Sequence, residues 1–219
     1  LFAARDVGLR RLAGDPMTDE EIQNAFASEI RVMGAADQVV AVSEGEREAI
    51  QKHGGRHVEV LGHSLDVVPE ETPFHDRQGL LFVGAAHGET SPNADSLIWF
   101  LREILPKIHR RLGDIPVTIA GVNQSATVRA LATPQVRVTG HLPSLRDCYS
   151  GSRIFIAPTR YAAGIPHKVH EAAAHGLPIV ATPLLAQQLG WTERELSIAE
   201  DAEAFAARCI EIYTDQPKW

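Results

Sequence analysis

The chain has 219 residues, of which 44% are hydrophobic, 6% aromatic and 22% charged, a composition typical of a globular protein with one or two ordinary cores. Its 21 basic and 28 acidic residues give a net charge of −7, and no cluster of lysine or arginine stands out, which argues against a nucleic-acid partner. We find no apolar run long enough for a transmembrane segment and no leader-like start, so we expect a cytoplasmic protein, free or peripheral to a membrane in its full-length form.

Residues 1–65 carry the pattern of a partial α/β domain. The chain begins at Leu1 rather than at methionine and enters at once on a helical pattern, so we expect a piece of a longer protein. Ser43 begins a capping box, and its hydroxyl is therefore interpreted as a helix cap rather than a catalytic group. The predicted elements are a helix over residues 20–33, a strand over 37–43, a helix from Ser43 to about residue 54, and a strand over 57–61.

Residues 66–78 contain Pro69, Pro73 and several charges, which predicts a linker between this domain and a second one over residues 79–219. The second domain repeats a short apolar strand followed by a helix six times. The strands are predicted at residues 80–83, 117–120, 136–139, 154–157, 179–181 and 196–198, and the helices at 92–111, 126–132, 144–150, 166–175, 184–189 and 202–213. Such a pattern predicts an α/β fold with a doubly wound parallel sheet, Rossmann-like and covered on both faces.

Ligands of doubly wound sheets bind at the carboxyl ends of the strands. Here three of those ends are glycines, Gly84, Gly121 and Gly140, which either allow close approach to a ligand or serve tight turns. A fourth end leads into residues 158–164. We therefore expect the functional site along this edge.

The segment over residues 164–182 is the most informative part of that edge. A glycine turn is followed by a short helix with Lys168 and Glu171, then by a glycine stop and a strand. Two residues three positions apart lie on one helix face, and the free N–H groups at the start of a helix suit an anion. The segment therefore predicts recognition of phosphate and hydroxyl groups.

Other kinds of site fit less well. His167, Glu171 and His175 recur every four residues, but His170 and His175 are five apart, so their side chains diverge and the H-E-x-x-H metal motif is not met. We predict no metal site. No G-x-S-x-G elbow is present, and the turn after residue 83 lacks the G-x-G-x-x-G fingerprint of nicotinamide enzymes. The two cysteines, Cys148 and Cys209, show no paired spacing and are interpreted as core thiols of a reducing compartment.

A series of short motifs resembles the donor-binding, C-terminal half of GT-B retaining glycosyltransferases of the group 1, family 4 type. The motifs are Phe82-Val83-Gly84, Pro92-Asn93, Glu103-Ile104-Leu105-Pro106, Thr118-Ile119-Ala120-Gly121, Val138-Thr139-Gly140-His141-Leu142, Ala157-Pro158, the run from Gly164 to Ala172, and the run from Gly176 to Thr182. The resemblance covers about residues 36–213, since residues 36–44 resemble the end of the family's acceptor-side domain. It implies a truncated enzyme that is inactive as this chain alone.

By this resemblance the ligand is a nucleotide-diphosphate sugar, bound without a metal or other cofactor. Glu171 matches the second glutamate of the family's Glu-x7-Glu motif, which holds the ribose hydroxyls, and Lys168 would face the diphosphate. The main chain from Gly140 to Leu142 would meet the base, and the amides of Gly164 and Ile165 the phosphate or sugar. The candidate donor-binding residues are Gly84, Gly140, His141, Leu142, Arg160, Gly164, Ile165, His167, Lys168 and Glu171. No catalytic residue is assigned.

Two departures from the family pattern leave alternatives open. Ala163 stands where the first glutamate of the motif is expected, and Ala85-Ala86-His87 replaces the usual basic residues after Gly84. The main hypothesis is a retaining hexosyltransferase acting on an unknown glycan, lipid or small-molecule acceptor. The alternatives are a catalytically inactive nucleotide-binding or scaffolding module and, more weakly, a nucleotide-sugar epimerase.

Overall fold

The computed structural model describes all 219 residues and divides them into two compact units. The first consists of Leu1–Ser64 with Tyr161–Pro166, and the second of Leu65–Arg160 with His167–Trp219. None of the helices is both long enough and apolar enough to cross a membrane.

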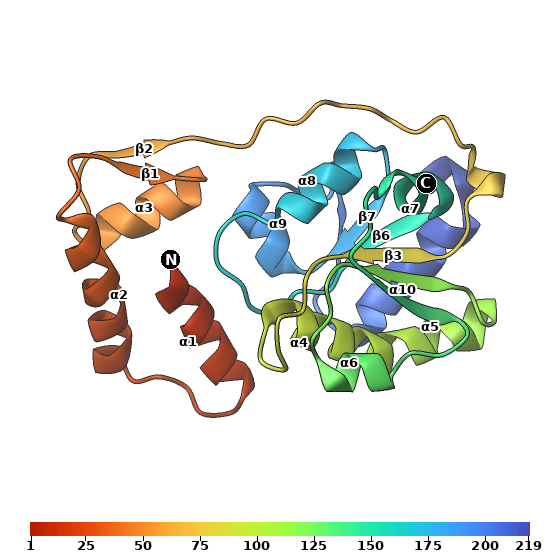
Figure 1. Ribbon diagram of the computed structural model, residues 1–219, viewed down its shortest axis with the longest axis horizontal. Coiled ribbons are helices and arrows are strands. Elements are labelled where there is room, and N and C mark those ends of the chain that lie inside the picture. Colours follow the sequence, from red (N-terminus) through yellow and green to blue (C-terminus); the bar gives the residue numbers. More distant parts are fainter. The chain divides into compact units, whose positions relative to one another are not determined.

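The first unit is a small α/β fragment. Its elements are α1 (Phe2–Leu12), α2 (Asp19–Met33), β1 (Val39–Ala41), α3 (Glu44–Lys52) and β2 (Val58–Val60), with β1 and β2 paired in parallel (Figure 1). Ser43 caps α3, as predicted, because its Oγ accepts a hydrogen bond of 3.1 Å from the Glu46 amide. The predicted capping box is not closed, since the Glu46 carboxylate accepts instead from the amide of Val42 at 3.0 Å.

The second unit confirms the predicted doubly wound parallel sheet. Its strands are β3 (Leu80–Val83), β4 (Val117–Ala120), β5 (Val136–Gly140), β6 (Ile154–Ala157), β7 (Ile179–Ala181) and β8 (Ser197–Ile198). Every neighbouring pair is parallel, and the order across the sheet is β5-β4-β3-β6-β7-β8. The strand order therefore reverses direction at β3 and β6, which is where such folds open a crevice for ligands.

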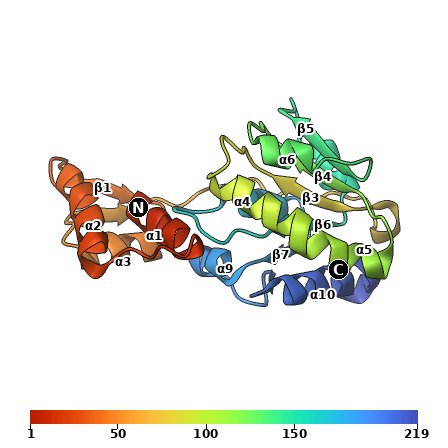
Figure 2. The same cartoon turned by 90° about the horizontal axis from the view of Figure 1, so that it is seen from below.

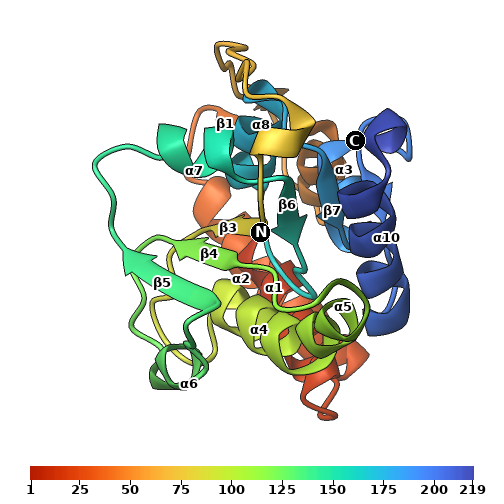
Figure 3. The same cartoon turned by 90° about the vertical axis from the view of Figure 1, so that its right-hand side faces the viewer.

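Helices cover both faces of this sheet (Figure 3). They are α4 (Pro92–Trp99), α5 (Leu105–Leu112), α6 (Ala126–Ala130) and α10 (Ala202–Thr214) on one face, and α7 (Arg146–Gly151), α8 (His167–Ala174) and α9 (Pro183–Leu189) on the other. Alternate residues of β3 supply both cores: Leu80 and Phe82 pack on the first face, Leu81 and Val83 on the second. Burial on both faces explains why the strands are continuous apolar runs.

The helix predicted over residues 92–111 is wrong in one respect, because a π-helical turn interrupts it. The turn spans Phe100–Ile104 and joins α4 to α5, which run on in line (Figure 2). Pro106 lies in the first turn of α5, where it lacks an N–H and its ring would clash with the carbonyl four residues earlier. A wider π turn relieves both conflicts. Elsewhere the predicted boundaries differ by one or two residues, as expected for frayed helix ends.

The segment from Leu65 to Gly79 is bound to the second unit over much of its length. The amides of Val68 and Glu70 donate to the carbonyls of Ala174 and His175 at the end of α8, at 2.9 and 3.2 Å. A single 3₁₀ turn, Phe74–Asp76, lies near its end. Arg77, only 1% exposed, donates side-chain hydrogen bonds back to the carbonyls of Thr72 and Glu70, so the segment has a defined conformation rather than that of a loose tether.

Candidate functional site

The candidate site lies at the carboxyl ends of β3 and β6, where α4, the turn after β6 and the start of α8 meet. Buried Thr159 follows β6, and its main-chain carbonyl accepts a 2.5 Å hydrogen bond from the Thr182 hydroxyl after β7. The Ser96 hydroxyl of α4 lies 3.3 Å from the Thr159 hydroxyl. These two hydrogen bonds connect helices on opposite faces of the sheet at the switch point, and they fix the carboxyl ends of the strands there.

Three glycines line the same edge along neighbouring strands. The Gly121 amide donates to the carbonyl of Gly140 at 2.9 Å, and the register between β4 and β5 shifts there by one residue. Gly121 adopts φ +128°, and a Cβ atom on it would lie 2.5 Å from the carbonyl oxygen of Gly84. Glycine is therefore required at residue 121 by both conformation and space.

Substituting Gly121 with alanine is expected to reduce the free energy of unfolding by about 2 kcal/mol, the cost of a strained backbone together with a clash against main-chain atoms. Urea unfolding followed by tryptophan fluorescence measures this loss. Gly88→Ala is the matched control, since a Cβ on Gly88 would meet open space. Equal unfolding midpoints for the two variants would show that the tight approach to Gly84 is not a constraint.

Lys168 is held at this switch-point edge of the sheet, which we call the crevice. Its Nζ donates a 2.7 Å hydrogen bond to Oδ1 of Asn93 in the first turn of α4 and lies 4.2 Å from the centre of the Phe82 ring. Asn93 is itself fixed, because its Nδ2 donates to the carbonyl of Ala85 at 2.8 Å. Burial lowers the pKa of Lys168 to about 7. The result is a positioned amine with one neutral hydrogen-bond partner and no bound counter-charge, which suits an incoming anion.

Arg160 is the second cation of the crevice, but it has a partner. Its guanidinium forms a bidentate salt bridge with the Asp95 carboxylate of α4, with a distance of 3.0 Å from Nε to Oδ2. The guanidinium also lies over the Trp99 ring. Such planar pairs fix geometry and balance charge. Arg160 therefore ties the turn after β6 to α4, and Lys168 is the cation left for a ligand.

Glu171 lies one turn along α8 and is half-buried. One turn further on, His175 stacks on Tyr149 of α7, whose side chain is completely buried. Burial, and then the negative charge of Glu171, raise the pKa of Tyr149 well above its ordinary value. The Tyr149 hydroxyl is therefore protonated, close to the carboxylate, and without a partner of ordinary hydrogen-bond geometry.

His175 has a structural role beside this pair. Its imidazole stacks on the Tyr149 ring, with centroids 4.4 Å apart, and Nδ1 lies 3.2 Å from Oε1 of Glu70. The helix α8 ends at Ala174, so His175 follows its last residue, and the His175 amide donates to the Glu171 carbonyl. His175 thus links the segment before β3 to the helix that carries Lys168 and Glu171.

The other predicted residues lie in several places. Gly84, Gly140 and half-buried Leu142 belong to the carboxyl edge of the second unit, and His141 and His167 are exposed. Gly164 and Ile165, with Ala163 before them, group with the first unit, and Gly164 adopts φ +77°. The structure therefore brings together Lys168, Arg160 and Gly84 around α4, while the roles of all ten residues in binding stay a prediction.

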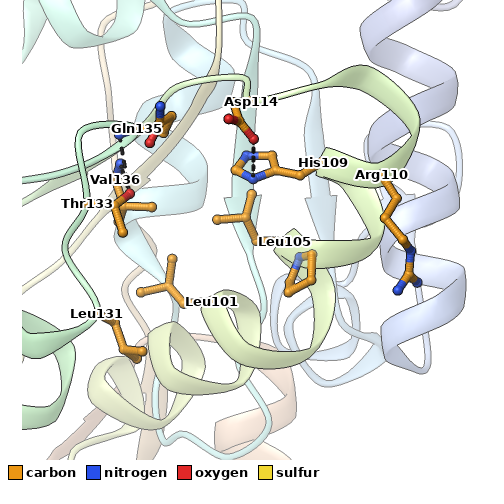
Figure 4. A pocket seen from close by; sticks show the side chains of 10 residues that line it. Leu101, Leu105, His109, Arg110, Asp114, Leu131, Thr133, Gln135 and Val136 are labelled. Carbon is orange, nitrogen blue, oxygen red and sulfur yellow. Dashed lines mark hydrogen bonds and ion pairs between the residues drawn. The ribbon is translucent and has the colours of Figure 1, made fainter.

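A cavity of about 610 Å³ lies away from this crevice, at the amino ends of β4 and β5 (Figure 4). Leu101, Leu105 and Leu131 form an apolar part of its wall, and His109 lies beside Asp114, with 3.7 Å between Nδ1 and the carboxylate. None of the predicted site residues lines it. Its position at the wrong end of the strands separates it from the ligand edge of a doubly wound sheet.

Asn93 and Tyr149 are the residues that sequence reasoning missed. Asn93 belongs to the Pro92-Asn93 motif, and its position beside the proline at a helix start is a usable signal, since a polar side chain there lies at the carboxyl edge of the sheet. Tyr149 gave no signal, because a tyrosine in a short amphipathic helix ordinarily belongs to the core.

The strand order, with its switch point between β3 and β6, defines a doubly wound, Rossmann-like unit, and comparisons with known proteins agree. The family model for "Glycosyl transferases group 1" matches residues 77–215. The chain therefore belongs to the group 1 glycosyltransferases, and its fold is that of GT-B enzymes.

Solved structures and one curated sequence are similar to this chain. A TarM variant from S. aureus, in complex with fondaparinux, α-GlcNAc-glycerol and UDP, matches with a TM-score of 0.74 at 11% identity, over 92% of this chain and 42% of that one. HepE from Anabaena, in complex with UDP and glucose, matches with a TM-score of 0.72 at 14% identity, over 90% of this chain and 59% of that one. An uncharacterised 44.6 kDa protein of the cps region of Klebsiella pneumoniae is 30% identical over 128 residues, 54% of this chain and 33% of that protein. The chain thus spans about a third of the curated relative.

Proposed function

We propose that the full-length protein transfers a hexose from a uridine or guanosine diphosphate sugar to an acceptor with retention of the anomeric configuration. The observation that carries this proposal is the amine of Lys168, held by Asn93 at the switch point of the sheet, in a chain of a glycosyltransferase family. The UDP found with TarM and HepE supports a uridine nucleotide as the first probe.

The proposed chemistry is electrostatic. Transfer of the sugar leaves negative charge on the departing diphosphate, and the ammonium of Lys168 and the positive end of the α8 helix dipole would stabilise it. A lysine already bonded to Asn93 and fixed over Phe82 loses little freedom on binding, and the diphosphate anion favours its charged form, so the ammonium is in place when the bond to the sugar breaks. We propose that no metal ion is needed and that this half of the enzyme supplies no catalytic base.

Glu171 is proposed to accept hydrogen bonds from both ribose hydroxyls. A carboxylate can accept two parallel donors, which two neighbouring hydroxyl groups provide. Substituting Glu171 with alanine is therefore expected to weaken binding of UDP to the full-length protein by roughly 1–3 kcal/mol, the contribution of charged hydrogen bonds. Titration calorimetry measures the change.

Glu103→Ala is the matched control for this variant, because Glu103 is an exposed glutamate on the opposite face of the second unit. Its affinity for UDP should equal that of the unchanged protein. If neither UDP nor GDP bound the unchanged full-length protein, the proposed function would be lost. If binding were normal in both variants, Glu171 would have no part in holding the ribose.

Ala163 favours a second candidate function, a nucleotide-binding module that has lost catalysis. The residue stands eight positions before Glu171, where the family pattern has a glutamate for the donor sugar. Turnover separates the two candidates: release of UDP from UDP-sugars by the full-length protein excludes the inactive module, whereas tight UDP binding without turnover across a panel of UDP- and GDP-sugars establishes it.

A further inference from the structure

The packing of α7 against the end of α8 leaves one polar atom without a function in the fold. Tyr149 is completely buried, and its ring is fixed by stacking on His175, with planes only 10° apart. Its main chain is engaged as well, since its amide donates to Leu145 and its carbonyl accepts from Arg77. The phenol hydroxyl alone has no partner of ordinary hydrogen-bond geometry.

A buried hydroxyl without a partner costs folding free energy, and phenylalanine would fill the same space without that cost. Glu171 lies one turn before His175, whose amide donates to the Glu171 carbonyl and whose ring stacks on Tyr149, and the negative charge of Glu171 raises the pKa of Tyr149 after burial itself. The hydroxyl therefore keeps its proton and can serve as a donor over the whole physiological pH range. A carboxylate is the best acceptor for such a donor.

We propose that Tyr149 is a positioning residue for Glu171, whose hydroxyl donates to one carboxylate oxygen when a nucleotide is bound and so orients the carboxylate toward the ribose. This inference rests on the proposed function, because it assigns Glu171 to the ribose hydroxyls. The carboxylate has about four acceptor positions, so it can take the tyrosine hydroxyl and two ribose hydroxyls at once. Without the tyrosine, a half-buried glutamate side chain can turn among its rotamers.

The surroundings of Tyr149 are built to keep its ring still. His175 lies against it and is itself anchored by Glu70, whose carboxylate is also 3.5 Å from Arg146 on α7. This chain of contacts joins α7, the end of α8 and the segment before β3. A rigid ring can hold its hydroxyl at a fixed place near Glu171, which is what a positioning residue requires.

Tyr149→Phe tests the proposal, because it removes only the hydroxyl. If the residue were merely part of the core, the variant would bind nucleotide normally. We expect instead that the unfolding temperature stays the same or rises, while the dissociation constant of the full-length protein for UDP increases about tenfold, the effect of one hydrogen bond to a charged group. For the same reason the KM for the sugar nucleotide should increase with kcat little changed.

Two further titrations make the test specific. Tyr149→Phe should have no additional effect in a Glu171→Ala background, and with 2′-deoxy-UDP, which lacks one ribose hydroxyl, the loss should shrink to less than about threefold. Tyr213→Phe is the matched control: its hydroxyl accepts a 2.9 Å hydrogen bond from the Gly79 amide, so this variant should lower stability without changing UDP affinity.

Failure of this inference is distinguishable from failure of the proposed function. If Glu171→Ala weakens UDP binding and Tyr149→Phe does not, the positioning role is overturned and the ribose site stands. Equal losses with UDP and 2′-deoxy-UDP, or additive losses with Glu171→Ala, also overturn it. If Glu171→Ala has no effect, or no nucleoside diphosphate binds, the proposed function falls and this inference falls with it.

Discussion

Replacing Lys168 with methionine is expected to raise the dissociation constant of the full-length protein for UDP by about 100-fold, because the variant loses the one charged donor left for the diphosphate. Methionine has a similar length and fills the space above Phe82, so the crevice should keep its shape. Titration calorimetry measures the affinity, and uridine, which lacks phosphates, should bind the variant and the unchanged protein equally.

Lys107→Met is the matched control for this prediction. Lys107 is a half-buried lysine of α5 that pairs with Glu203 of α10, on the face of the sheet opposite α8. Its loss should leave UDP affinity unchanged. A Lys168→Met variant that bound UDP as tightly as the Lys107→Met variant would remove Lys168 from the diphosphate site.

The pH dependence of stability gives an independent view of the same lysine. Its pKa is about 7 in the folded protein, against an ordinary value of 10.5. Between these two pH values the unfolded chain therefore binds more protons than the folded protein. Burial of the charged lysine lowers the free energy of unfolding below about pH 7, and this cost is removed as pH rises from about 7 to the ordinary pKa of 10.5. Unfolding midpoints measured against pH should show this rise in stability for the unchanged protein relative to Lys168→Met. Parallel curves would contradict a buried amine.

Replacing Arg77 with methionine is expected to lower the free energy of unfolding of the second unit by about 3 kcal/mol, since three main-chain carbonyls, one of them buried, lose their donor. The guanidinium donates to Thr72 at 2.8 Å, Glu70 at 2.9 Å and Tyr149 at 3.4 Å, and lies over the Trp219 ring. Urea unfolding followed by tryptophan fluorescence is suited to the measurement, because all three tryptophans belong to this unit.

Arg111→Met controls for the loss of a positive charge, because Arg111 is exposed near the end of α5. Its unfolding midpoint should lie within experimental error of the unchanged protein. If Arg77→Met were equally stable, the other anchors of the segment from Leu65 to Gly79 would suffice to hold it, and Arg77 would be replaceable.

Most of the fold could be predicted from the sequence because local signals and burial agree along the second unit. Four-residue apolar strands such as β3 and β6 fit a sheet covered on both faces, and Ser91 with Pro92 marks the start of α4. The π turn before Pro106 could not be predicted in this way. The spacing of apolar residues continues across it, and only the conflict of the proline ring with the preceding turn reveals the interruption.

Less of the site could be predicted, because its important contacts join residues far apart in the chain. The spacing of Lys168 and Glu171 on one helix indicated a site for phosphate and hydroxyl groups. Nothing in that spacing shows that Asn93, 75 positions from Lys168, accepts a hydrogen bond from the lysine, or that Asp95 forms a salt bridge with Arg160. The lowered pKa of Lys168 likewise depends on burial, which arises only when α4, β3 and α8 come together.

A crystal structure of the full-length protein with UDP, or with GDP if that binds more tightly, is the most direct test of the donor site. We expect the ribose hydroxyls within hydrogen-bond distance of the Glu171 carboxylate, the diphosphate on the Lys168 ammonium, and the Tyr149 hydroxyl on the other side of Glu171. A nucleotide bound elsewhere, for example in the cavity lined by Leu101 and His109, with Lys168 and Glu171 left without contact to it, would contradict the assignment of this crevice to the sugar nucleotide.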